Sequence, residues 1–204
     1  MRRLIHLLAV LVTLGLGAPA LAQEYPALHD VTGVASDDVL NVRSGPGAGH
    51  EIVGTLGPYD TGVEVIRLNE TGTWGFVNTG EQSGWTSMRF LAARPGGTLP
   101  DWPALSCFGT EPFWSLTINQ GQSAVMNNMG QQQGYSVGNL VKASGRPWPY
   151  ALFGQAGLES LSAVITPGYC DDGMSDREFG LTIALILQGN QQAYYSGCCA
   201  LDGR

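Results

Sequence analysis

Lysine and histidine are scarce in this chain of 204 residues. Lys142 is its one lysine, and its three histidines, His6, His29 and His50, all lie within the first 50 residues. Binding to nucleic acid or to an anionic membrane surface depends on clustered Lys and Arg, whereas the formal net charge of this chain is −7. Neither nucleic acid nor an anionic membrane surface is therefore expected as a partner.

Sequence patterns for metal and redox chemistry are also missing. A structural zinc site combines cysteines with histidines or with a second CxxC pair, and a thioredoxin-like site needs CxxC at the start of a helix. This chain contains no CxxC, and its histidines lie far upstream of its cysteines. The twelve-residue pattern of an EF-hand calcium loop is absent as well. The sequence therefore predicts no metal site and no cofactor.

The longest apolar run, Leu4–Leu16, follows Arg2 and Arg3 and precedes the small-x-small triplet Ala20-Leu21-Ala22. These are the three parts of a secretory signal peptide. The run is shorter than the roughly 20 residues needed to span a bilayer, which favours cleavage over a membrane anchor. We predict that residues 1–22 are removed and that the mature protein is exported to the periplasm, without stable membrane insertion.

Four cysteines, Cys107, Cys170, Cys198 and Cys199, all follow residue 100. An even number in an exported chain indicates two disulfides. A bond between Cys198 and Cys199 would be strained, because adjacent Cα atoms lie about 3.8 Å apart and disulfides prefer about 5.5–6 Å. We predict that these two pair separately with Cys107 and Cys170. On a strand they would point to opposite faces, with one bridge inside and one outside.

Short alternating runs of Val, Ile, Thr and aromatic residues indicate an all-β chain with two small domains. Between them, residues 92–106 read "AARPGGTLPDWPALS", in which three prolines and two glycines interrupt every periodic pattern. We predict a first domain at 23–93, a linker at 94–105 and a second domain at 106–204.

The first domain contains five strand-length runs, at Val39–Arg43, Ile52–Leu56, Gly62–Leu68, Trp74–Asn78 and Trp85–Leu91. Such short strands with frequent turns are typical of a small barrel. The ordered elements "LNVRSGPG", "IVGTL", "VEVI", "TWGFV" and Gly84-Trp85 followed by "RFL" resemble the bacterial SH3-like (SH3b) family over about residues 30–93. This resemblance implies an SH3-like barrel with a binding role, holding cell-wall peptides or protein partners, usually beside a separate catalytic domain.

Three residues of this domain are candidates for ligand binding. Arg43 follows the alternation of Leu40 and Val42, so its side chain should face the neighbouring loop. Trp74 and Trp85 lie near strand starts, where an indole can pack one side on the core and expose an edge. Core filling is the alternative role for each tryptophan.

The second domain also reads as strands. Residues 113–118 alternate, and the stretches "LESLSAVIT" and "FGLTIALIL" each place apolar residues on one face. This pattern predicts an antiparallel β-barrel or β-sandwich that is stapled by the disulfides. In a closed sheet the first and last strands become neighbours, which would bring Cys107 close to Cys198 and Cys199.

A second resemblance covers residues 107–199. The segments "CFGTEPFWSLTI", "CDDGMSDREFG" and "SGCC", in that order, resemble an uncharacterised bacterial envelope domain for which no activity is established. A looser similarity in size and inferred topology links it to the heat-shock META domain and to MliC-type lysozyme inhibitors. Architecture alone does not transfer function.

A catalytic site is not evident in this domain. The segment "GYSVG" at 134–138 fits the nucleophile-elbow pattern, but no histidine follows Ser136. A polar group beside the cysteines consists of Glu111, Asp171, Asp172, Asp176 and Arg177. From this region we take Glu111, Asp172, Asp176 and Arg177, together with Trp114, as candidate ligand-binding residues. The carboxylates could also serve acid/base chemistry, or could form a turn and an ion pair with a purely structural role.

We therefore expect a non-enzymatic periplasmic binding protein whose SH3b module recognises cell-wall peptide or an envelope protein partner. The alternatives are a cell-wall hydrolase that uses Glu111 with Asp172 or Asp176, and an inhibitor of a lysozyme-like hydrolase.

Overall fold

The computed structural model of the chain describes residues 24–190 and 192–202. They form sixteen β-strands and one short 3₁₀ helix, so the predicted all-β class is confirmed. The predicted signal peptide, residues 1–22, lies outside the described residues. Within the part of the chain that the structure describes, no helix has the length and apolar character needed to cross a membrane.

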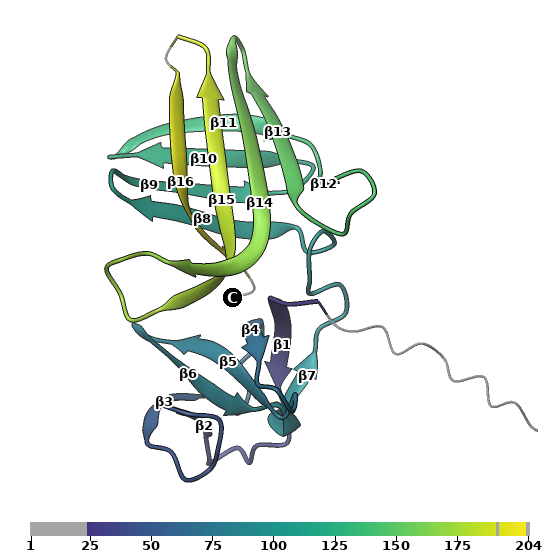
Figure 1. Ribbon diagram of the computed structural model, residues 1–204, viewed down its shortest axis with the longest axis vertical. Helices are drawn as coiled ribbons and strands as arrows, with labels where there is room; N and C mark the ends of the chain where they lie inside the picture. Colours follow the sequence, from purple (N-terminus) through teal and green to yellow (C-terminus); the bar gives the residue numbers. More distant parts are fainter. Residues whose placement is uncertain (1–23, 191, 203–204) are drawn as a thin grey trace, which may run out of the picture.

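Seven antiparallel strands form the N-terminal sheet, which is the lower half of the molecule in Figure 1. Its strand order is β3-β2-β6-β5-β4-β1-β7. The strands are β1 Ala27–Val31, β2 Leu40–Arg43, β3 Ile52–Leu56, β4 Val63–Leu68, β5 Trp74–Thr79, β6 Gln82–Ser87 and β7 Leu91–Ala93. A small core of valines and leucines, among them Val42, Val63, Val65 and Val77, lies between them.

Four of the five predicted strands agree with β2 to β5 within one residue at each end. The fifth prediction, one strand over Trp85–Leu91, is wrong. Strand β6 ends at Ser87, and a 3₁₀ helix, Met88–Phe90, turns the chain so that β7 pairs with β1. The Met88 N–H donates to the Thr73 carbonyl and so fixes the start of this turn. Strand β1 was not predicted, because four of its five residues are buried and it lacks alternation.

The C-terminal sheet is the upper half of Figure 1. Its order is β11-β10-β9-β8-β16-β15-β14-β13-β12, and β11 also pairs with β13. Eight strands therefore close into an antiparallel barrel, which confirms the barrel alternative, and β12 lies beside β13 outside the ring. The strands are β8 Ala104–Thr110, β9 Phe113–Asn119, β10 Ser123–Asn128, β11 Gln131–Val137, β12 Val141–Lys142, β13 Tyr150–Ala156, β14 Glu159–Asp171, β15 Glu178–Gln188 and β16 Ala193–Leu201.

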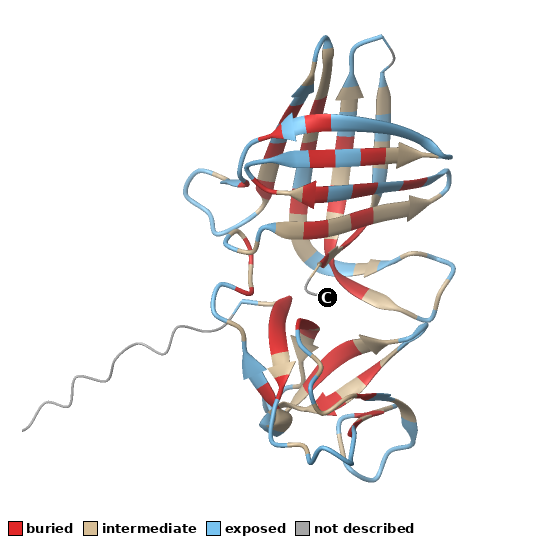
Figure 2. Ribbon diagram, turned by 180° about the vertical axis from the view of Figure 1, so that it is seen from behind, coloured by how far each residue is buried: buried red, intermediate tan, exposed pale blue. Residues whose placement is uncertain are grey.

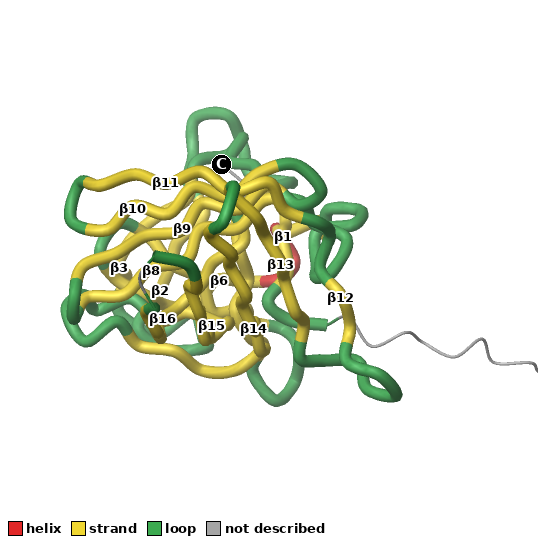
Figure 3. Tube along the Cα trace, turned by 90° about the horizontal axis from the view of Figure 1, so that it is seen from above, coloured by secondary structure: helices red, strands yellow, loops and turns green. Residues whose placement is uncertain are grey.

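Barrel strands adjacent in the sequence pair with one another, apart from the short β12, and the first, β8, pairs with the last, β16. Figure 3 shows them following one another around the barrel. In Figure 1, β13 to β16 stand in front of β8 to β11 and run across them.

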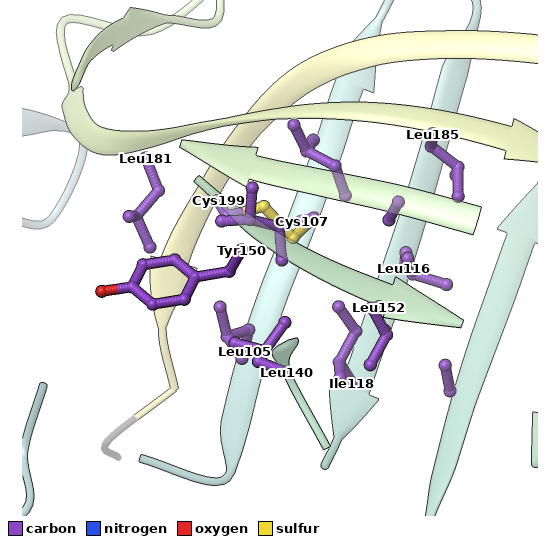
Figure 4. Packing of buried hydrophobic residues seen from close by; sticks show 14 of the residues in the cluster. Leu105, Cys107, Leu116, Ile118, Leu140, Tyr150, Leu152, Leu181, Leu185 and Cys199 are labelled. Carbon is purple, nitrogen blue, oxygen red and sulfur yellow. A yellow bond between two sulfur atoms is a disulfide. The ribbon is translucent and has the colours of Figure 1, made fainter. Parts of the chain in front are cut away.

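The inward faces of these strands fill the barrel. Trp114, Leu116 and Ile118 alternate with exposed residues on β9, as predicted. On the opposite wall, the predicted apolar faces of β14 and β15 are buried too, although Leu187 is only partly covered. Figure 4 shows leucines from several strands meeting around the Cys107–Cys199 bridge. Figure 2 shows buried and exposed residues alternating along the β8 to β11 wall.

The disulfide pattern confirms that Cys198 and Cys199 pair separately. Cys199 lies directly opposite Cys107 and bonds to it inside the barrel, joining the last strand to the first. Cys198 bonds to Cys170, near the end of β14. The two bridges leave opposite faces of β16, as expected, but Cys198 on the outer face is as deeply buried as its neighbour.

The N-terminal sheet and the barrel are in direct contact. Leu28 of β1 is fully buried and belongs to the apolar cluster of the barrel, not to that of its own sheet. Its backbone exchanges hydrogen bonds with the segment after β7: the Leu28 N–H donates to the Gly97 carbonyl, and the Arg94 N–H donates to the Leu28 carbonyl. We propose that the domain boundary lies within the predicted linker, residues 94–105, of which 94–103 form the strand-free connection between the two sheets.

The two disulfides should contribute unequally to stability. The Cys107–Cys199 loop spans 92 residues and the Cys170–Cys198 loop spans 28, and the loop-entropy model gives about 4.6 and about 3.6 kcal/mol. We expect Cys107→Ser/Cys199→Ser to lower the free energy of unfolding more than Cys170→Ser/Cys198→Ser. Urea denaturation of both double variants measures this. Non-reducing peptide mapping that found other pairs would contradict the assignment.

His29 should make the stability of the protein sensitive to acid. Burial lowers its pKa, against the opposing influence of the Ala27 carbonyl and Asp30. Below the ordinary histidine pKa of about 6.5, the unfolded chain takes up a proton that the folded chain resists. The free energy of unfolding should therefore fall as the pH decreases from about 7 to about 5.

Urea denaturation across this pH range tests the prediction. His29→Gln should flatten the dependence, whereas His50→Gln, at an exposed position, should leave it unchanged. Equal slopes in the wild type and in His29→Gln would contradict the role of His29.

Candidate functional site

A groove of about 610 Å³ lies on the N-terminal sheet. Three segments surround it: the chain before and along β2, the loop after β2, and the 3₁₀ turn with the start of β5. Its lining residues are Gly33, Val34, Ala35, Asp38, Val39, Leu40, Asn41, Arg43, Ala48, Trp74, Ser87, Arg89 and Phe90. Arg43 and Trp74, two of the predicted ligand-binding residues, are therefore brought together.

Arg43 stands at the end of β2 and points toward the following loop, as predicted. Its Nη1 donates a hydrogen bond of 2.7 Å to the His50 carbonyl, and the Ser44 N–H donates to the Glu51 carbonyl. The His50 ring lies 2.6 Å from where a Cβ on Gly45 would be, so any larger residue at position 45 would push the ring aside. The loop thus folds back on itself and holds the arginine at the groove.

Trp74 enters the groove from the start of β5. The Trp74 backbone N–H donates to Asn69 Oδ1, and the residue is half-buried, so its indole both packs on the sheet and presents a surface. Phe90 lines the groove from the 3₁₀ turn, with the Arg89 guanidinium 4.5 Å from its ring centroid. Sequence analysis did not single out Arg89 or Phe90, although the "RFL" segment contains both.

The groove combines two arginines and two aromatic rings with one carboxylate. Asp38 accepts a hydrogen bond from the Val39 N–H, which ties the carboxylate to its own turn. Arginines bind carboxylates through paired, charge-assisted hydrogen bonds, and aromatic faces cover apolar side chains. This arrangement suits a peptide that carries both a carboxylate and a small apolar group.

Trp85 belongs to a different cluster. Its ring packs edge-on against Phe76, with the centroids 5.0 Å apart, and the Arg67 guanidinium lies 5.5 Å from the Trp85 centroid. It is not among the residues that line the groove. The two predicted tryptophans therefore do not form one binding surface, although both are half-buried.

Arg67 connects this cluster to the barrel. Its guanidinium lies 3.7 Å from the Phe76 ring centroid, and its Nη1 donates to the Glu178 carboxylate at the start of β15. The Glu178 backbone is held as well: its N–H donates to the Ser83 hydroxyl, and its carbonyl accepts from the Asn78 side chain. No sequence signal indicated this contact, because Arg67 and Glu178 are 111 residues apart.

Asp172 organises the loop between β14 and β15. Its carboxylate accepts hydrogen bonds from the Met174 and Ser175 N–H groups and from the Ser175 hydroxyl. Burial would raise the pKa of Asp172, but these hydrogen bonds and nearby Arg177 outweigh it and hold the pKa below its ordinary value. Because Asp172 is held in its ionised form by these partners, we favour a structural role for it in the turn over a role as a proton donor in catalysis.

The other candidates of the barrel are dispersed. Asp176 is exposed and forms a parallel bridge with Gln82 of the N-terminal sheet. Arg177 lies over the Phe179 ring and lines a polar cleft of about 380 Å³ between sheet and barrel. Glu111 is exposed in the β8–β9 turn. Within residues 24–190 and 192–202, neither acidic residue forms a salt bridge with Arg177.

Trp114 lies in the barrel core instead of on a binding surface. It is 5% exposed, and its ring packs against Tyr195. The same strand alternation that predicted its burial explains this position, since it shares a face with Leu116 and Ile118. The burial of Trp114 favours a role in core packing over ligand binding.

The nucleophile-elbow pattern has no matching geometry. Ser136 lies on β11, and the chain continues into β12 and β13, whereas the elbow requires a following helix. Among the described residues, no three His, Cys, Asp or Glu side chains are grouped so as to hold a metal ion.

Comparison with known proteins assigns the N-terminal sheet. Residues 38–92 match the family model of the bacterial SH3 domain. The match contains the whole of β2 to β6 and most of the groove. No curated protein and no solved structure matches the chain. The bacterial SH3 domain is a binding-type module, which fits a binding role for this part of the chain.

The Arg67–Glu178 ion pair should couple the SH3 domain to the barrel weakly but measurably. The two side chains are 40% and 27% exposed, and partly exposed pairs contribute about 0.2–1 kcal/mol. We expect a double-mutant cycle with Arg67→Ala and Glu178→Ala to give a coupling energy in this range that falls with added salt. The Arg94–Asp30 pair is the matched control, because neither of its residues belongs to the barrel. Zero coupling at low salt would contradict the assignment.

Proposed function

We propose that this protein is an exported, non-enzymatic binding protein of the bacterial envelope, whose SH3 groove holds cell-wall peptide or a peptide segment of an envelope protein. The observation that carries the proposal is the groove itself, in which Trp74 and Phe90 lie beside Arg43 and Arg89 within a bacterial SH3 domain.

The composition of the groove supports a peptide ligand with a free carboxylate. Two guanidinium groups in one groove favour an anion, and Arg recognises carboxylates with defined geometry. The aromatic rings and Val39 offer apolar surface for short side chains. Short peptides of the cell wall carry both features.

Two features support an extracytoplasmic location. The first 22 residues read as a secretory signal peptide. All four cysteines are paired in the structure, and disulfides persist mainly in oxidising compartments such as the periplasm. Both bridges stabilise the barrel, which would then serve as the rigid support of the SH3 domain.

Co-sedimentation of the mature chain, residues 23–204, with purified peptidoglycan sacculi tests the proposal. The whole mature chain is preferable to the SH3 domain alone, because Leu28 packs in the barrel core. We expect the protein to pellet with sacculi and to be released by soluble wall peptides. A protein that stays in the supernatant would exclude the wall as ligand. A cleared band in zymography would instead support the hydrolase alternative.

Variants of the groove should separate its residues from the second aromatic cluster. Trp74→Ala and Arg89→Ser should each weaken binding to sacculi about tenfold or more, because each removes a contact surface or a charge partner of the ligand. Trp85→Phe, outside the groove, should bind as the wild type does. Arg146→Ser removes an exposed arginine from a distant loop and controls for net charge.

Unfolding curves identify variants that lose binding because they fail to fold. If Arg89→Ser and Arg146→Ser weaken binding equally, general charge attraction explains it and the groove is not the site.

A further inference from the structure

The wall of the barrel carries no charge. Between Ala104 and Asp202, every Asp, Glu, Lys and Arg lies in a loop or at the first or last residue of a strand. A surface with about 25–35% charged residues is the design target for a soluble protein, and this chain has a formal net charge of −7. The charge-free wall is thus a distinct feature of the surface, and a binding partner could account for it.

The two sides of this wall differ in polarity. On β8 to β11, the exposed positions are mostly hydroxyl and amide residues: Ser115, Thr117, Ser123, Gln131, Gln132, Gln133 and Ser136. On β13 to β16, large apolar side chains point outward: Phe153 is 59% exposed, Val164 43%, Ile186 44% and Tyr194 66%. We call this second side, formed by the outward residues of β13 to β16, the apolar wall.

Strand register brings these side chains into two adjoining rows. Phe153 lies opposite Ser162, Ser162 opposite Ile186, and Ile186 opposite Tyr194. The neighbouring row runs from Ala151 through Val164 and Ala184 to Ser196. The first row holds three large residues and Ser162, and the second row holds Val164 among the smaller Ala151, Ala184 and Ser196. Figure 1 shows the four strands side by side at the front of the barrel.

We infer that the apolar wall is the contact between two copies of this chain, related by a twofold axis. In such an interface one surface patch meets the same patch on the partner. A charged patch would therefore meet charges of its own sign, whereas a charge-free patch carries no such penalty. In an acidic chain, the wall is a surface on which two copies can approach without repulsion between facing side chains.

The chemistry of the wall favours a protein over a glycan. Contact regions between proteins are depleted in charge and enriched in aromatic residues, and exposed apolar patches mark such regions. A sugar would leave its hydroxyl groups without hydrogen-bond partners against Val164 and Ile186, which costs free energy. The exposed Phe153 and Ile186 side chains are instead suited to pack against apolar side chains of a partner.

The size of the wall predicts a weak dimer. Four strands about 4.8 Å apart and about seven residues long, at about 3.4 Å per residue, cover roughly 450 Å². Standard interfaces bury about 800 Å² on each partner, and smaller ones belong to weak, transient contacts, so we expect a dimer that forms only at high protein concentration. Dimerisation would place two SH3 grooves in one particle, and two linked sites bind a repetitive ligand more tightly than one.

Sedimentation velocity of the mature chain, from about 1 to about 300 µM, tests the inference without any ligand. We expect a reversible monomer–dimer equilibrium that does not weaken at high salt, because no ion pair is involved. Ile186→Lys should weaken it by about tenfold or more, since like charges then face each other across the axis. Val125→Lys is the matched control on β10, where Val125 is 39% exposed, and should dimerise as the wild type does.

Three results would overturn the inference: a monomer over the whole concentration range, a dimer unaffected by Ile186→Lys, or a dimer lost equally in Val125→Lys. Binding of soluble, uncharged wall glycan that is lost in Ile186→Lys, with no dimer, would assign the wall to a glycan instead. Trp74→Ala should leave the dimer intact, so the outcome is independent of whether the SH3 groove binds sacculi.

Discussion

The pairing of β8 with β16 is the constraint on which the rest of the molecule depends. These are the first and last strands of an up-and-down barrel, so their pairing encloses the core and removes the free edges of the ring. Cys107 and Cys199 lie opposite each other in this pair and bond inside the barrel. A covalent link at this point restricts the unfolded chain across almost the entire second half.

Closure of the barrel also positions the loop that meets the SH3 domain. Strands β14 and β15 extend beyond the ring, with the Cys170–Cys198 bridge near their turn, and Asp172 orders the residues between them. The start of β15 thereby presents Glu178 to the SH3 domain, where its carboxylate and its backbone are both engaged. In the other direction, Leu28 of the N-terminal sheet packs in the barrel core. Although the two halves have separate cores, we therefore expect them to move as one body.

Features that depend on a single strand or on a single residue type could be predicted from the sequence. Alternation on β9 predicted the buried face of Trp114, although the sequence analysis also named Trp114 as a candidate ligand-binding residue. The spacing of adjacent Cα atoms excluded a Cys198–Cys199 bond, and the structure pairs each with a distant cysteine. The prediction of a single strand at Trp85–Leu91 failed, because the turn between β6 and β7 contains residues similar to those of the strands and leaves no break in the polarity pattern. Strand β1 was missed, since a strand covered on both faces loses the period of two.

What the sequence by itself determined was the all-β class, the SH3 domain, the paired cysteines and the acidic character of the chain. These follow from composition and from patterns within a few residues, which act wherever the chain lies in space. Only the tertiary structure placed Trp74 with Arg43 and Arg89, separated Trp85 from them, joined Arg67 to Glu178, and aligned Phe153, Ile186 and Tyr194 in one row. Each of these depends on strand register and on which faces meet, and both are set by packing between segments distant in the sequence.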